Sequence, residues 1–169
     1  MHLMVPTDVV RPPVGIHSFI EPNAAGPAEA YRDVLQQWHR AVLQSAFLSS
    51  KTRFDDAWQR LKAAALLRHG WDSYTADPPN EVARTLAGTI LDELEANHLP
   101  PTRLMPSVEG GIGLVFVEGG NRAYLEVCNT GETVVAIYQA QGEPEVWELD
   151  TTQASRNAAI HRIRVHLAD

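Results

Sequence analysis

The sequence predicts an α+β fold, in which helices pack on one face of a five-stranded antiparallel sheet. Two observations lead to this prediction. Apolar residues recur at helical spacing up to about residue 97, and they alternate with polar residues after Pro101. Short gaps that contain glycine separate the alternating segments, so neighbouring strands must run antiparallel.

Residues 1–26 are expected to form an extended arm, because prolines and glycines interrupt every short apolar run there. The arm nevertheless carries large apolar side chains, including Phe19 and Ile20, which are unfavourable in water. Two alternatives stay open: the arm lies on its own domain, or it docks on another chain through Phe19 and Ile20. The remainder, residues 27–169, is expected to form a single domain.

Residues 27–70 are predicted to form a helical hairpin. Its first helix runs from Ala28 to about Leu48 and its second from Thr52 to Gly70, and each carries one apolar stripe. The segment Ser49–Lys51 is expected to interrupt the helical structure between them. The Thr52 hydroxyl is suited to cap the second helix, and Gly70 is suited to end it.

Residues 71–150 are predicted to form one helix followed by the sheet. Asn80 can cap this helix, which reaches about Asn97 before Pro100 ends it. Its inward residues are expected to be Val82, Leu86, Ile90 and Leu94. The predicted strands are Arg103–Val108, Ile112–Val117, Arg122–Cys128, Thr133–Gln139 and Glu145–Leu149. Residues 151–169 then form a last helix, Gln153–Leu167, capped by Asp150 or Thr151.

Composition excludes several classes of function. The 169 residues are 44% hydrophobic and carry a net charge of −7, which argues against general nucleic-acid binding. No apolar run approaches the roughly 18 residues of a membrane span, and the first residues do not resemble a secretory signal. The lone cysteine, Cys128, excludes an intramolecular disulfide and fits a cytoplasmic protein. Residues 105–150 hold eight acidic residues against Arg122 alone, so this stretch accounts for the whole net charge.

The segment from His69 to Tyr74 is the richest local cluster of polar and aromatic residues. An enzymatic interpretation would pair His69 with Asp72 as acid and base, as in a small hydrolase or nuclease-like enzyme that also uses nearby carboxylates. The preferred interpretation is structural. Trp71 then packs back on the second helix, Asp72 accepts hydrogen bonds from turn amides, and Tyr74 covers the third helix.

No cofactor or metal is expected. Gly110 and Gly111 precede a strand rather than the helix that dinucleotide binding requires, so they are interpreted as hairpin glycines. The histidines lack the spacing of a zinc motif, because His161 and His166 lie about 140° apart around a helix. A site assembled from histidines distant in the sequence stays open.

Residues 66–150 resemble a widespread group of small bacterial proteins with a W-D-G-Y turn, a helix and an antiparallel meander. The matching segments are Gly70-Trp71-Asp72-Ser73-Tyr74, Pro78-Pro79, Leu99-Pro100-Pro101, Gly110-Gly111 and Arg122-Ala123-Tyr124-Leu125-Glu126-Val127. Ser73 stands where the family pattern has glycine. Because members of this group resemble accessory proteins encoded among mobile or antiviral-defence genes, the resemblance implies an accessory subunit or regulator in a defence or toxin–antitoxin system. It implies no reaction.

Strand alternation predicts which residues could meet a partner. Tyr124, Glu126, Cys128 and Glu148 are expected to point away from the apolar face of the sheet. This second face is the candidate binding surface, unless the basic last helix covers or neutralises it. We therefore expect a non-enzymatic protein whose residues Tyr124, Glu126 and Glu148 meet a basic surface on another protein. A homo-oligomer is the other possible assembly.

Overall fold

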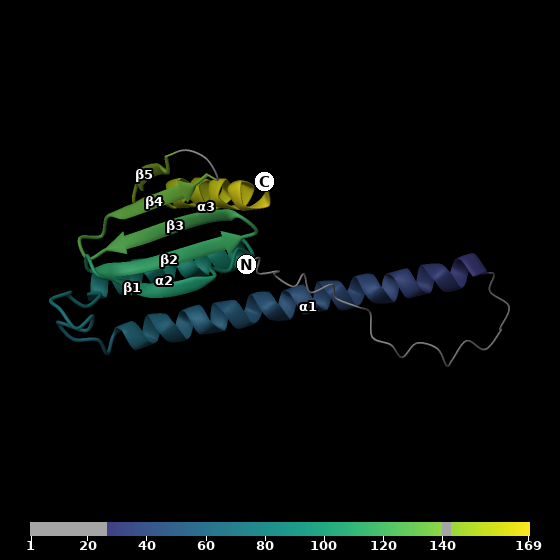
Figure 1. The fold of residues 1–169 in the computed structure, drawn as a ribbon, viewed down its shortest axis with the longest axis horizontal. Helices are drawn as coiled ribbons and strands as arrows, with labels where there is room; N and C mark the ends of the chain where they lie inside the picture. Colours follow the sequence, from purple (N-terminus) through teal and green to yellow (C-terminus); the bar gives the residue numbers. More distant parts are fainter. Residues whose placement is uncertain (1–26, 140–142) are drawn as a thin grey trace, which may run out of the picture. The chain divides into compact units, whose positions relative to one another are not determined.

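The computed structural model describes residues 27–139 and 143–169, in which the chain forms three helices and a five-stranded antiparallel sheet. The predicted α+β class is therefore confirmed. The helices are α1 (Pro27–Ala64), α2 (Glu81–Ala96) and α3 (Gln153–Ala168). The strands are β1 (Arg103–Ser107), β2 (Gly111–Glu118), β3 (Asn121–Cys128), β4 (Thr133–Tyr138) and β5 (Glu145–Leu149). They lie side by side in chain order, as the predicted meander (Figure 1).

The chain divides into two units, one that reaches Val42 and a compact one that comprises Leu43–Asp169. The sheet, α2 and α3 belong entirely to the compact unit. The predicted arm, with its candidate contacts Phe19 and Ile20, lies outside the described residues.

The predicted helical hairpin is wrong, because the single helix α1 takes the place of both its arms. No glycine or proline occurs between positions 28 and 69, and a serine costs a helix only about 0.5 kcal/mol relative to alanine. Thr52, the expected cap, instead donates its hydroxyl proton to the backbone oxygen of Leu48 at 2.9 Å. The helix ends at Ala64, and Gly70, with φ of 77°, belongs to the following turn rather than to a helix end.

The core lies between one face of the sheet and the helices. Alternate residues of β2 and β3 form its floor, and they are at most 1% exposed: Ile112, Leu114, Phe116, Ala123, Leu125 and Val127. Both α2 and α3 contact these two strands, and the last turns of α1 join the same apolar cluster through Phe54, Ala57, Leu61 and Ala64. The expected inward position of Val82 is wrong, because this residue is 52% exposed, whereas Ile90 and Leu94 are buried as predicted.

Hydrogen bonds and one ion pair fix α2 and α3 in place. Asn80 caps α2 as predicted, since its Oδ1 accepts from the backbone N–H of Ala83 at 2.9 Å. Thr152 caps α3, rather than the expected Asp150 or Thr151. Arg156 of α3 donates to the carboxylate of Glu93 in α2 at 2.8 Å, and both side chains are nearly buried. This pair joins the two helices over the sheet.

Candidate functional site

The face of the sheet opposite α2 and α3 is called here the open face. Its residues alternate with the buried core residues along each strand. Its main members are Met105, Val115, Arg122, Tyr124, Glu126, Cys128, Val134, Tyr138, Val146 and Glu148. The prediction that Tyr124, Glu126 and Glu148 share the outward face is thus confirmed by the strand register. The alternative in which the last helix covers this face is wrong, because the buried residues of α3 join the core on the other side.

Two carboxylates lie in one row across the open face. Glu126 of β3 is paired with Val134 of β4, which is paired in turn with Glu148 of β5. Two strand spacings therefore separate the two glutamates, a distance of about 9.5 Å. Neither glutamate takes part in an ion pair within the described residues. Arg122 is four residues from Glu126 along β3, about 13 Å away, too far for a direct ion pair.

Glu126 occupies the middle of the open face, on the central strand of the sheet. Its partner on β2 is Gly113, which offers no side chain to hydrogen bond with. Within the described residues, its Oε1 atom is buried and has no hydrogen-bond partner. Most buried polar atoms in proteins do have one, because an unpaired buried oxygen loses its water without compensation. One of the two oxygens of the Glu126 carboxylate is therefore shielded from water without a hydrogen-bond partner of its own.

The missing side chain of Gly113 makes room for Tyr124. A Cβ atom added to Gly113 would lie 2.5 Å from the Tyr124 hydroxyl and 2.8 Å from its Cε2, closer than any real contact. The phenol ring therefore leans over the glycine, beside Glu126. Burial raises the pKa of the Tyr124 phenol, and the negative charge of Glu126 raises it further.

The thiol of Cys128 lies next along the same face of β3. Burial raises its pKa, and the carboxylates of Glu126 and Glu132 raise it further. A thiol with a raised pKa is mostly protonated near neutral pH and is therefore a poor nucleophile. Cys128 does not have the surroundings of a catalytic cysteine.

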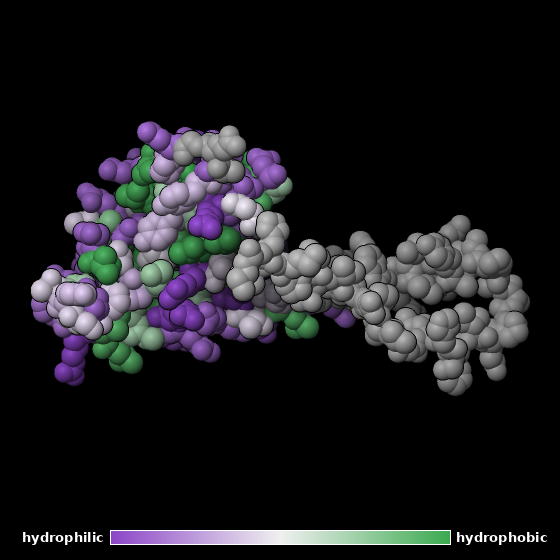
Figure 2. All heavy atoms as spheres, viewed as in Figure 1, coloured by the Kyte–Doolittle hydropathy of each residue, from purple (hydrophilic) through white to green (hydrophobic). Residues whose placement is uncertain are grey.

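Exposed apolar side chains share the open face with the carboxylate row. Val146 is 57% exposed, Tyr138 is 44% exposed and Val117 is 40% exposed, and all three lie on the open face. Figure 2 shows apolar and polar side chains intermixed on the compact unit as seen from one side. Tyrosine, which this face carries at two positions, is among the residues enriched at protein interfaces.

The segment from His69 to Tyr74 forms a turn that is organised by Asp72. The Asp72 carboxylate accepts hydrogen bonds from the backbone N–H groups of Tyr74 at 2.9 Å and Ala76 at 3.2 Å, as predicted. The predicted role of Tyr74 in covering a helix is wrong, because its side chain is 83% exposed. Trp71 is half-buried, and its Nε1 donates to the backbone oxygen of Asp77 at 3.3 Å, so it stabilises the turn itself.

His69 is held by a residue that the sequence did not single out. Its Nδ1 lies 2.9 Å from Oδ1 of Asp77, and both side chains are more than half exposed. Asp72 is already engaged by the turn amides. These contacts do not assemble the acid–base pair of His69 and Asp72 that the enzymatic alternative requires.

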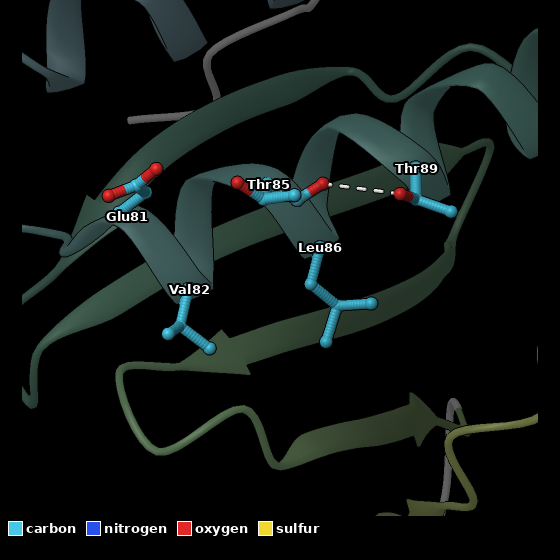
Figure 3. Close-up of a pocket in the computed structure, with 5 residues that line it drawn as sticks. All are labelled: Glu81, Val82, Thr85, Leu86 and Thr89. Atoms are coloured by element: carbon cyan, nitrogen blue, oxygen red, sulfur yellow. Dashed lines mark hydrogen bonds between the residues drawn. The ribbon is translucent and has the colours of Figure 1, made fainter.

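A shallow hollow lies beside the first half of α2. Its volume is about 490 Å³, and Glu81, Val82, Thr85, Leu86 and Thr89 line it (Figure 3). Val82 and Leu86 point away from the helix on one side, and the Thr89 hydroxyl donates to the backbone oxygen of Thr85 at 3.2 Å. One carboxylate beside threonines and aliphatic groups does not form a nucleophile and base pair.

Asn129 is a structural residue that sequence reasoning missed. Its Oδ1 accepts from the backbone N–H of Asn80 at 2.8 Å, and its Nδ2 donates to the backbone oxygen of Pro78 at 3.1 Å. The turn between β3 and β4 is thereby tied to the start of α2. No local signal could indicate this contact, because its partners lie about fifty positions away in the sequence.

Comparisons of the chain with protein-family models, curated proteins and solved structures find no match. The resemblance to small bacterial accessory proteins therefore stays a prediction. Among the described residues, no group of three or more metal-ligating side chains comes together, and no helix has the length and apolar character to cross a membrane.

Proposed function

We propose that this protein is a non-enzymatic binding protein that recognises a basic surface of another protein through its open face. The observation that supports this most directly is the carboxylate row of Glu126 and Glu148, neither of which has an ionic partner among the described residues. An accessory or regulatory role in a bacterial defence system is the part of the proposal that rests on the resemblance alone.

The chemistry of the open face favours a protein partner. Exposed apolar groups such as Val146 and Tyr138 supply surface to bury, and half-buried Tyr124 supplies an aromatic group of the kind enriched at interfaces. The two carboxylates would select a partner of opposite charge and would repel acidic ones. The excess of acidic residues in the stretch 105–150 adds a longer-range attraction for basic surfaces.

The test is capture of the natural partner from a lysate of the source cells with three forms of the protein. The first is the wild type, and the second carries Glu126→Lys and Glu148→Lys. The third is a control with Asp92→Lys and Glu95→Lys, which makes the same change in charge at exposed positions of α2. All three are first shown to fold by circular dichroism and thermal melting.

We expect the wild type and the α2 control to retain the same basic protein in a fixed ratio. The open-face variant should lose it, because two negative charges become positive where the partner binds, a change of four units in net charge. Equal recovery by all three forms would contradict the proposal. A complex whose mass corresponds to a second copy of this chain would instead identify a homo-oligomer.

A further inference from the structure

Glu126 and Glu148 carry the same charge but differ in their surroundings. Glu148 is exposed near the end of β5, the edge strand, where water solvates its carboxylate. Glu126 is partly buried on the central strand, with Oε1 enclosed and unpaired. The two carboxylates are therefore not equivalent, since only Glu126 has an oxygen that is shielded from water and lacks a hydrogen-bond partner among the described residues.

We propose that Glu126 is the anchor of the interface and that it binds a guanidinium or ammonium group of an arginine or lysine side chain from the partner. This inference rests on the proposed function and specifies its central contact. The partner's cation would supply the Glu126 carboxylate with the counter-charge that it lacks among the described residues.

The geometry around Glu126 supports an incoming side chain with an apolar stem. Gly113 on one side presents no side chain, and the Tyr124 ring lies over it next to the carboxylate. Val134 borders Glu126 on the other side. Arginine and lysine have aliphatic stems that pack on such groups, and a guanidinium also stacks on an aromatic ring.

Charge complementarity argues for a cation and against a neutral ligand. Besides Glu126 itself, Glu132 lies close enough to Cys128 to affect its thiol, and Glu148 is in the same row. The one basic residue that alternation places on this part of β3 is Arg122, which pairs with Tyr138 in another row. The other arginine of the open face, Arg103 on β1, lies in the row of Tyr124. Carboxylates therefore outnumber basic groups around Glu126, and a basic side chain is its natural complement.

The test uses a synthetic peptide, so that it does not depend on the natural partner. The ¹⁵N-labelled full chain is titrated with acetyl-Val-Arg-Val-amide and, in parallel, with the isosteric citrulline peptide, which lacks the charge. The backbone resonances are followed to peptide concentrations of about 10 mM, a range in which a single weak contact is measurable. The protein is studied as wild type, as Glu126→Gln and as Glu148→Gln.

We expect saturable shifts around positions 124–128 with the arginine peptide and at least about tenfold weaker binding of the citrulline peptide. Glu126→Gln should lower the affinity for the arginine peptide by a similar factor, whereas Glu148→Gln should change that affinity by less than about twofold.

Three results would overturn the inference: no saturable shift, equal binding of the two peptides, or equal weakening by the two glutamine variants. These results would leave the proposed function standing if the open-face variant still failed to capture the natural partner. Conversely, peptide binding through Glu126 together with unimpaired capture would overturn the proposed function and leave the cation site in place.

Discussion

Ser73 is the clearest residue with an unfavourable backbone. Its φ is 73°, a left-handed conformation that non-glycine residues rarely adopt. The turn imposes this angle, because the backbone N–H of Ser73 donates to the oxygen of Gly70 at 3.0 Å and Asp72 holds the next amides. The serine therefore holds a backbone conformation that glycine adopts more readily.

Ser73→Gly should therefore stabilise the protein. Glycine adopts a positive φ without the steric penalty of a Cβ atom, so the free energy of unfolding should rise by about 1 kcal/mol. Ser73→Ala is the matched control, because it removes the hydroxyl but keeps the Cβ atom. Urea denaturation would measure both. A gain in the alanine variant as large as in the glycine variant would show that the backbone angle is not the cause.

Gly113 illustrates the opposite case, in which the lack of a Cβ atom is required by a neighbour. Gly113→Ala should destabilise the fold by about 2 kcal/mol, because the new methyl group would displace the Tyr124 ring. In a Tyr124→Ala background, the same substitution should cost little, since the obstacle is gone. Thermal melting of the two single variants and the double variant would measure this coupling. Additive effects would mean that the ring and the glycine do not compete for space.

Among the elements, the strands and α2 follow from the sequence because their signals are local. Alternation places Leu114 and Leu125 in the core, and an asparagine at position 80 satisfies the first amides of α2 whatever surrounds it. The single continuous helix α1 was not predictable in this way, and a helical hairpin was predicted in its place. Serine and lysine at positions 49–51 weaken a helix only slightly, and the sequence alone does not show that α1 continues through them.

The ion pair between Glu93 and Arg156 belongs to this scale because it joins α2 to α3. The two side chains are only 11% and 12% exposed, and Arg156 donates from Nε and from Nη2 to the two carboxylate oxygens of Glu93, each at 2.8 Å. Glu93→Ala should lower the free energy of unfolding by about 3 kcal/mol, because Arg156 would remain buried without its counter-ion. Chemical denaturation is the measurement.

The control for this prediction is the pair of Asp56 and Arg60 on α1, whose side chains are 51% and 48% exposed. Asp56→Ala should cost no more than about 0.5 kcal/mol, because water solvates both charges when the pair is broken. If the two alanine variants lost the same stability, the pair between α2 and α3 would contribute no more than a surface contact does.

For the whole molecule, sequence reasoning placed the candidate surface but not its central feature. Alternation along the strands is enough to assign Tyr124, Glu126 and Glu148 to one face. The burial of one Glu126 oxygen depends on its register with Gly113 and on the position of the Tyr124 ring. Neither is a property of a single strand, so no periodicity could reveal it.

The crowding of Tyr124 and Cys128 beside Glu126 should make the stability of the whole molecule sensitive to alkaline pH. In the unfolded chain these groups lose their protons near their ordinary pKa values of 10.0 and 9.0, whereas both pKa values are raised in the folded protein. At high pH the folded state therefore binds more protons than the unfolded state. The free energy of unfolding must then fall as the pH rises from about 9 into the range above 10.

Tyr124→Phe should flatten the part of this decrease that lies above pH 10.0, because phenylalanine does not titrate. The part of the decrease in the free energy of unfolding that is due to Cys128, which begins near pH 9.0, should remain. Cys128→Ser is the complementary variant, since it removes the thiol and should flatten instead the part of the decrease that begins near pH 9.0. Urea denaturation at a series of pH values measures the slope independently of any change in stability at neutral pH. Parallel curves for the wild type and Tyr124→Phe would show that the phenol beside Glu126 is not preferentially protonated in the folded state.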